Sequence, residues 1–125
     1  MAKEKILLVD DEVDFVEVLS TRLEANGFEV LPAYDGEEAL EKVKEYKPDM
    51  IILDIMMPKI NGFDVCRKLK LDQTYKDIPV IMLTAKFQVS DIKFGAAMGA
   101  NAYITKPFEP GVLLDKIREL LKKDK

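Results

Sequence analysis

The sequence contains no histidine, a single cysteine and no long apolar run, and each absence excludes a class of protein. Without histidine, the chain has no imidazole for a metal site, for general-base catalysis or for a phosphohistidine relay of its own. One thiol, Cys66, cannot form an internal disulfide, which favours a reducing compartment. No stretch approaches the roughly 18 apolar residues of a membrane-spanning helix, and the run from Ile6 is too short for a signal peptide. We therefore expect a cytoplasmic protein without membrane insertion.

Proline and glycine are also scarce, with six of each in 125 residues, and 48% of the residues are hydrophobic. This composition excludes collagen-like repeats and disorder. Positive charge is in the minority, since 19 Lys and Arg face 23 Asp and Glu, and the only basic cluster is the final "LKKDK". We therefore expect no direct nucleic-acid binding by this chain. The length suits one domain with a sizeable core, which we expect to comprise residues 1–125.

Apolar runs without alternation are typical of strands buried on both faces of a parallel sheet. The strands expected from such runs, and from two weaker ones, are residues 6–9, 28–34, 50–53, 80–83 and 102–105. Pro32 lacks a backbone donor, so the second strand belongs at an edge of the sheet. The last strand is short and partly polar, which suits the opposite edge.

Helical patterns fill the intervals between these runs. The helices expected are residues 13–26, a second one that opens at Asp35, a third that follows Asn61–Gly62, a fourth over about 89–99 that Gly95 weakens, and a fifth that follows Pro110. Asp35 and Glu38 have the spacing of a capping box, and Cys66 is expected to pack in the core. Alternating strands and helices predict an α/β fold: a flavodoxin-like, five-stranded parallel sheet of order 2-1-3-4-5 with helices on both faces.

In such a sheet the carboxyl ends of all strands lie at one edge, and here polar residues follow four of the five strands. These residues are Asp10 and Asp11, Asp54, Thr84, and Thr105 with Lys106. Each has an ordinary alternative: Asp10 or Asp11 as a helix cap, Asp54 as a turn residue, Thr84 as a cap and Lys106 as a solvated charge. Together, at one edge of the sheet, they predict a site for phosphoryl transfer. Carboxylates suit Mg²⁺, an aspartate can accept a phosphoryl group, and a lysine and a hydroxyl can bind phosphate oxygens.

Four segments, "LLVDDE", "IILDIMMPKINGFD", "VIMLTA" and "AYITKPF", resemble in order and spacing the receiver domain of two-component response regulators. The likeness covers essentially the whole chain. It implies a phosphorylation-controlled switch in which Asp54 accepts a phosphoryl group from a histidine kinase or a histidine phosphotransfer protein. It also implies an Mg²⁺ site made by Asp10, Asp11, Asp54 and the main-chain carbonyl of Met56.

The same resemblance gives roles to residues near the last two strands. It implies that Thr84 and Lys106 bind the phosphoryl group, that Tyr103 is a switch residue and that the Lys106–Pro107 bond is cis. It further implies that Met56 and Lys86 tune the phosphoryl lifetime. The surface around the fourth helix, the fifth strand and the fifth helix would carry the signal to an output protein or domain. Catalysis would be limited to the protein's own phosphorylation and dephosphorylation.

Three other families deserve comparison with this pattern. A haloacid-dehalogenase-type phosphatase needs a second acid two residues after its nucleophile, where this chain has Met56. A flavodoxin needs a phosphate loop rich in hydroxyl and amide groups after the first strand, where this chain has acids. A receiver-like module without phosphorylation would lack some of the residues that this chain retains, which are Asp10, Asp11, Asp54, Thr84 and Lys106. We expect no output domain within these residues, and the choice between a stand-alone receiver and part of a longer regulator stays open.

Overall fold

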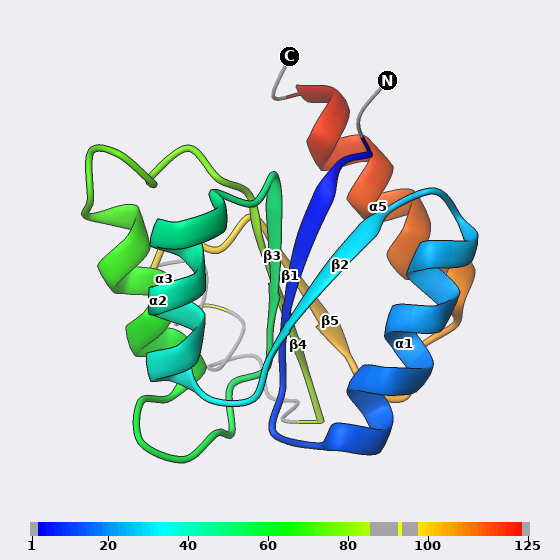
Figure 1. Cartoon of the computed structure of the whole chain (residues 1–125), viewed down its shortest axis with the longest axis horizontal. Helices are drawn as coiled ribbons and strands as arrows, with labels where there is room; N and C mark the ends of the chain where they lie inside the picture. Colours follow the sequence, from blue (N-terminus) through cyan, green and yellow to red (C-terminus); the bar gives the residue numbers. More distant parts are fainter. Residues whose placement is uncertain (1–2, 86–92, 94–97, 124–125) are drawn as a thin grey trace.

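The computed structural model describes residues 3–85, 93 and 98–123 (Figure 1). Its strands form one five-stranded sheet of order β2-β1-β3-β4-β5, and every adjacent pair is parallel, as the sequence predicts. The strands are β1 (Lys5–Val9), β2 (Glu29–Ala33), β3 (Met50–Leu53), β4 (Val80–Thr84) and β5 (Ala102–Thr105). The helices described are α1 (Val13–Ala25), α2 (Gly36–Tyr46), α3 (Gly62–Lys70) and α5 (Pro110–Lys123). Most of the helix predicted over about 89–99, including Gly95, lies outside the described residues.

The sheet separates two apolar layers because successive side chains of a strand point to opposite faces. Ile6 and Leu8 of β1 pack toward α1 and α5, whereas Leu7 and Val9 pack toward α2 and α3. Figure 1 shows these two helix pairs on opposite sides of the sheet. The continuous apolar runs thus have the predicted cause, which is burial on both faces.

The edge strands have the features predicted for them. β2 is an edge strand, and its Pro32 lies opposite Leu8 of β1 in the register. β5 forms the other edge, and its residues are only partly buried. The central strand β3 is fully buried. The strongly apolar runs of the sequence therefore lie in the middle of the sheet, and the weaker runs lie at its edges.

Local hydrogen bonds explain where two of the helices begin. Asp35 caps α2 by accepting a hydrogen bond from the Glu38 N–H at 2.8 Å, and this bond holds the pKa of its carboxyl below the ordinary value. The Glu38 carboxylate in turn accepts a bond of 2.6 Å from the N–H of Tyr34, one residue before the cap. Asn61 caps α3 in the same way, through the Asp64 N–H. The predicted cap by Asp35 is therefore confirmed, while the bond of Glu38 goes to the residue before the one that a capping box uses.

The described helices bury apolar side chains against the sheet. In α3, Cys66 is fully buried beside Phe63 and Leu69, as predicted for a core thiol. In α1, Leu19 and Leu23 are buried, while Phe15 is half-buried at the rim of the same layer. No helix within the described residues is both long and apolar enough to cross a membrane.

Candidate functional site

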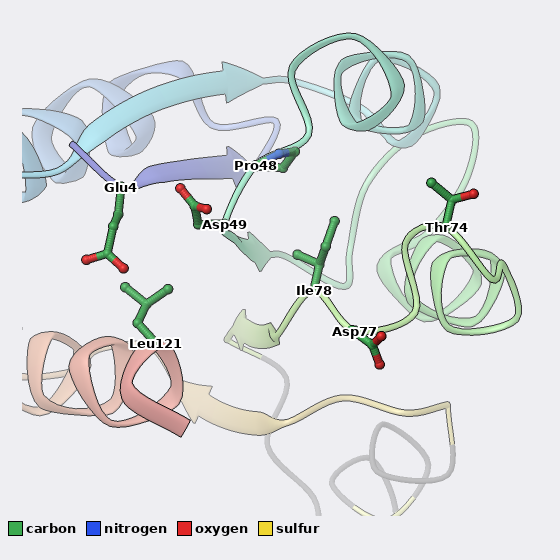
Figure 2. Close-up of a pocket in the computed structure, with 7 residues that line it drawn as sticks. All are labelled: Glu4, Pro48, Asp49, Thr74, Asp77, Ile78 and Leu121. Carbon is green, nitrogen blue, oxygen red and sulfur yellow. The ribbon is translucent and has the colours of Figure 1, made fainter. Parts of the chain in front are cut away.

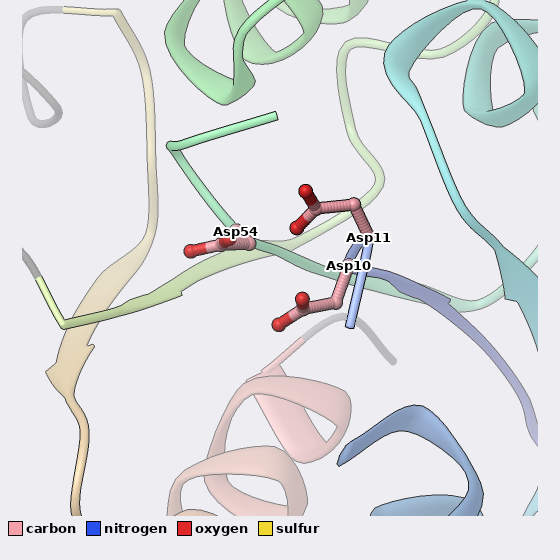
Figure 3. A group of neighbouring side chains, drawn as sticks. All are labelled: Asp10, Asp11 and Asp54. Atoms are coloured by element: carbon pink, nitrogen blue, oxygen red, sulfur yellow. The ribbon is translucent and has the colours of Figure 1, made fainter. Parts of the chain in front are cut away.

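Three aspartates meet at the carboxyl edge of the sheet. Asp10 and Asp11 follow β1, Asp54 follows β3, and an oxygen of each lies within 4.8 Å of the others (Figure 3). Backbone hydrogen bonds fix two of them, because the Asp10 N–H donates to Ala33 at 3.0 Å and the Asp54 N–H donates to Val9 at 2.9 Å. Asp10 and Asp54 are buried and Asp11 is exposed. The sheet register therefore brings together the three acids that the sequence singled out.

This group has the donor set of a site for a hard divalent cation. All three ligand groups are carboxylates, and hard cations such as Mg²⁺ and Ca²⁺ prefer oxygen ligands of this kind. Two of the acids are buried, and like charges so close repel one another unless a cation neutralises them. The exposed Asp11 leaves the group open to solvent on one side. The residues therefore fit a metal ion.

Lys106 is the cation that reaches this group from β5. Its ammonium donates to Asp10 Oδ2 at 2.6 Å and lies 3.4 Å from Glu12 Oε1, and only 14% of the side chain is exposed. Burial by itself lowers the pKa of Lys106, but the hydrogen bond and charge of Asp10, helped by Asp54 and Glu12, raise it overall. Lys106 is thus a paired, charged group, and the alternative of a solvated charge is wrong.

The helix-cap alternative for the first two aspartates is also wrong. The N-cap residue of α1 is Glu12, whose side chain makes no capping bond. Asp10 Oδ1 accepts a bond of 2.9 Å from the Glu12 N–H itself, and Asp10 Oδ2 faces Lys106. The carboxylate of Asp10 therefore holds the acidic turn and the lysine together.

The remaining predicted residues that the structure describes lie on β4 and β5 or shortly after β3. Thr84 ends β4 and pairs in register with Thr105, directly before Lys106. Met56, two residues after Asp54, has an exposed side chain. Tyr103 of β5 is half-buried against the layer of α2 and α3. The Lys106–Pro107 bond is cis, as the resemblance implied. Lys86 lies outside the described residues.

Two contacts of Lys106 are not predicted by the sequence. Its ammonium lies 4.0 Å from the centroid of the Phe15 ring, and Glu12 is its second acidic partner. Phe15 lies in the helix expected over residues 13–26, and the sequence predicts no role at the site for it. Helical periodicity indicates which face is apolar, but it carries no signal for a cation from a distant strand resting on that ring.

A hollow of about 270 Å³ lies at the opposite, amino-terminal edge of the sheet (Figure 2). Its lining is Glu4, Pro48, Asp49, Thr74, Asp77, Ile78 and Leu121. Asp49 there accepts a hydrogen bond from the Lys5 N–H at 2.7 Å. None of the residues predicted for the site lies in this hollow, so the candidate functional site is the aspartate group at the carboxyl edge.

Known proteins share both this sequence pattern and this fold. The family model of the response regulator receiver domain matches residues 6–118. The ycf27 protein of Porphyridium aerugineum is 46% identical over 123 residues, which cover 98% of this chain and 50% of that protein. The alkaline phosphatase synthesis transcriptional regulatory protein PhoP of Bacillus subtilis is 43% identical over 119 residues, which cover 95% of this chain and 49% of PhoP. The chain thus spans about half the length of these curated relatives.

A solved structure gives the same result over its full length. Chemotaxis protein CheY4 of Vibrio cholerae is 35% identical, has a TM-score of 0.89, and the match covers 95% of this chain and 99% of CheY4. The phosphatase alternative finds no support in these comparisons, in agreement with Met56 at the position where that family needs an acid. The family match, the relatives and the shared fold together place this chain in the family of response regulator receiver domains of two-component signalling.

Proposed function

We propose that this chain is a phosphorylation-controlled switch whose phosphoacceptor is Asp54. The phosphoryl donor would be a phosphohistidine of a histidine kinase or of a histidine phosphotransfer protein. The observation that carries this proposal is the convergence of three aspartates on one point of the sheet edge, with Lys106 bonded to Asp10 at 2.6 Å. Among the three, Asp54 is buried at the end of the central strand β3.

The cofactor of this reaction is Mg²⁺, held by Asp10, Asp11, Asp54 and the main-chain carbonyl of Met56. Mg²⁺ is typically bound by one or two carboxylates together with phosphate oxygens, which suits this donor set. When bound, the ion supplies neutralising charge to the phosphoryl oxygens. The mutual repulsion of the three carboxylates would be relieved at the same time.

In the transfer, an oxygen of the Asp54 carboxylate attacks phosphorus, the new O–P bond forms and the N–P bond to the donor histidine breaks. The electron pair of that bond returns to the histidine nitrogen. Lys106 and Thr84 bind the oxygens of the transferred group, and phosphoryl transfer of this kind depends mainly on positioning and charge. Catalysis is limited to the protein's own phosphorylation and dephosphorylation, whose rate Met56 and Lys86 tune.

The phosphorylated state would be transmitted through Tyr103, the switch residue, to the surface around the predicted helix over 89–99, β5 and α5. The partner there is an output protein or domain. PhoP is named as a transcriptional regulatory protein, but the match covers only 49% of it, so we assign no nucleic-acid contact to this acidic chain. We further propose that residues 1–125 form one receiver domain in the cytoplasm.

Chemical phosphorylation tests this proposal without the cognate kinase. Incubation with acetyl phosphate and Mg²⁺ should add one phosphoryl group, detected by intact mass, and EDTA should prevent the uptake. Asp54→Asn and Asp54→Ala should abolish it. Asp64→Asn, which changes an exposed carboxylate of α3, should be labelled like the wild type. Uptake by both Asp54 variants at the wild-type rate would contradict the assignment.

A further inference from the structure

The ammonium of Lys106 is enclosed by one aromatic ring as well as by two carboxylates. Its nitrogen lies 4.0 Å from the centroid of Phe15, 2.6 Å from Asp10 and 3.4 Å from Glu12. A lysine side chain carries its charge on a flexible four-carbon stem. Several contacts are therefore needed to hold the ammonium in one position. The Phe15 ring supplies a restraint in addition to those of the two carboxylates.

Phe15 is itself anchored from two directions. It belongs to α1, which begins directly after the acidic turn, and it packs against the apolar layer shared with α5. Its ring also meets Phe108 edge to face, with the centroids 6.3 Å apart and the planes at 81°. Phe108 lies two residues after Lys106 in the chain. The aromatic pair therefore joins the strand end that carries the lysine to the helix that follows the aspartates.

We propose that Phe15 is a positioning residue for phosphoryl transfer, because its ring face holds the Lys106 ammonium within reach of the acceptor Asp54. This inference rests on the proposed function, since it concerns the same site. A carboxylate that holds the lysine competes with the phosphoryl oxygens for its hydrogen bonds. A ring face attracts the cation without taking a hydrogen bond, so the ammonium can exchange Asp10 for a phosphoryl oxygen while the ring still holds it.

The effect should be modest and specific. Cation–π contacts at partly exposed sites contribute enough to change an equilibrium or a rate about three- to tenfold. Phe15→Leu keeps an apolar side chain at the rim of the core but removes the ring face. Phe15→Tyr keeps the face. Phe108→Leu is the matched control, because it removes the edge contact and leaves the ring beneath Lys106.

The first measurement follows the position of Lys106 without any phosphorylation. In protein labelled with ¹³C-lysine, the ε-methylene resonance of Lys106, assigned with Lys106→Arg, should be displaced to high field by the ring current. Phe15→Leu should abolish that displacement, and Phe15→Tyr and Phe108→Leu should retain most of it. An unchanged resonance in Phe15→Leu would overturn the inference. Phe15→Met serves as a second ring-free variant if thermal unfolding shows that Phe15→Leu does not fold.

The second measurement is the rate of phosphoryl uptake from acetyl phosphate at saturating Mg²⁺. Phe15→Leu should be about three- to tenfold slower than the wild type, and Phe15→Tyr should be within about twofold of it. In a Lys106→Ala background the Phe15→Leu effect should vanish, because the ring then has no ammonium to hold. An equal effect in both backgrounds would show that Phe15 acts only by packing, which overturns this inference alone. A wild-type protein that accepts no phosphoryl group would overturn the proposed function and the inference together.

Discussion

At the scale of single residues, the carboxylate of Asp10 connects the parts of the site. One oxygen accepts the Glu12 N–H at 2.9 Å and the other accepts the Lys106 ammonium at 2.6 Å. Asp10 is 1% exposed, so these bonds replace the hydrogen bonds to water that a carboxylate loses on burial. Asp11, its neighbour in the chain, is exposed and carries its charge next to the same centre. Removing Asp10 should therefore disrupt bonds that hold the site together, whereas removing Asp11 should mainly remove a charge.

Replacing Asp11 should separate metal binding from folding. At an effective dielectric constant of about 20, two charges 4.8 Å apart repel by roughly 3 kcal/mol, and solvent around Asp11 reduces this cost. Asp11→Asn should therefore unfold at the same or a higher temperature than the wild type in EDTA. Free Mg²⁺ at about 100 times its Kd should stabilise the wild type by about 2.7 kcal/mol. We expect Asp11→Asn to bind Mg²⁺ about tenfold more weakly, measured by titration calorimetry.

The control for this experiment is Asp77→Asn, which changes an exposed carboxylate in the hollow at the opposite edge of the sheet. It should leave the Mg²⁺ affinity unchanged. An Asp11→Asn protein with wild-type affinity would show that Asp11 is not a ligand.

The buried thiol of Cys66 should make the free energy of unfolding depend on pH. Burial raises the pKa of its thiol to about 11, although the charge of Lys70 opposes the shift. In the unfolded chain a thiol ionises near pH 8.5, so above about pH 8.5 the unfolded state loses its proton first and the folded state is destabilised. The stability advantage of the wild type over Cys66→Ala should shrink by roughly 3 kcal/mol between about pH 8 and pH 11. Urea titrations at both pH values measure it, and a constant difference would contradict the assigned burial effect.

At the scale of elements, α3 supports the acceptor strand through a backbone contact. The Gly62 N–H donates to Ile55 at 3.0 Å, and a Cβ built on Gly62 would lie 2.2 Å from the carbonyl oxygen of Asp54. Only glycine fits at position 62, because the first turn of α3 lies directly against the backbone of Asp54. The loop between β3 and α3 thereby fixes the end of β3 on which Asp54 stands.

Gly62→Ala should therefore destabilise the protein by about 3 kcal/mol, since neither backbone can move away without breaking this contact. Gly111→Ala is the matched control in α5, where an added Cβ has no neighbour within 4 Å. That change should be neutral or stabilising by up to about 1 kcal/mol, because alanine favours the helix. Chemical denaturation measures both, and equal midpoints for the two variants would refute the contact.

The elements also show how far the sequence could predict the fold. The apolar runs of β1, β3 and β4 and the proline of β2 indicated which strands lie in the middle of the sheet and which at an edge, because they report burial or edge position directly. The flavodoxin-like order satisfies these positions, and the structure has that order. The capping pair at Asp35 was readable because its partners are three residues apart. The contact between Gly62 and Asp54 was not readable, since the glycine has an ordinary backbone conformation and only its neighbour in space explains it.

At the scale of the whole molecule, the candidate site exists because three strands end at one edge. β1 carries Asp10 and Asp11 to that edge, β3 carries Asp54 and β5 carries Lys106. The sequence predicted this convergence from the topology of a parallel sheet. It did not predict that Lys106 rests on Phe15, because the first turn of α1 meets the segment after β5 there, and no periodicity encodes a contact between residues so distant in the sequence.

Locating the modified residue shows directly whether Asp54 is the phosphoacceptor at this edge. Borohydride reduces an acyl phosphate to an alcohol, so a phosphorylated aspartate becomes homoserine and can be found by mass spectrometry of peptides. After treatment with acetyl phosphate and Mg²⁺, we predict homoserine at position 54, with Asp10 and Asp11 unchanged. Homoserine at any other aspartate, with Asp54 intact, would contradict the account.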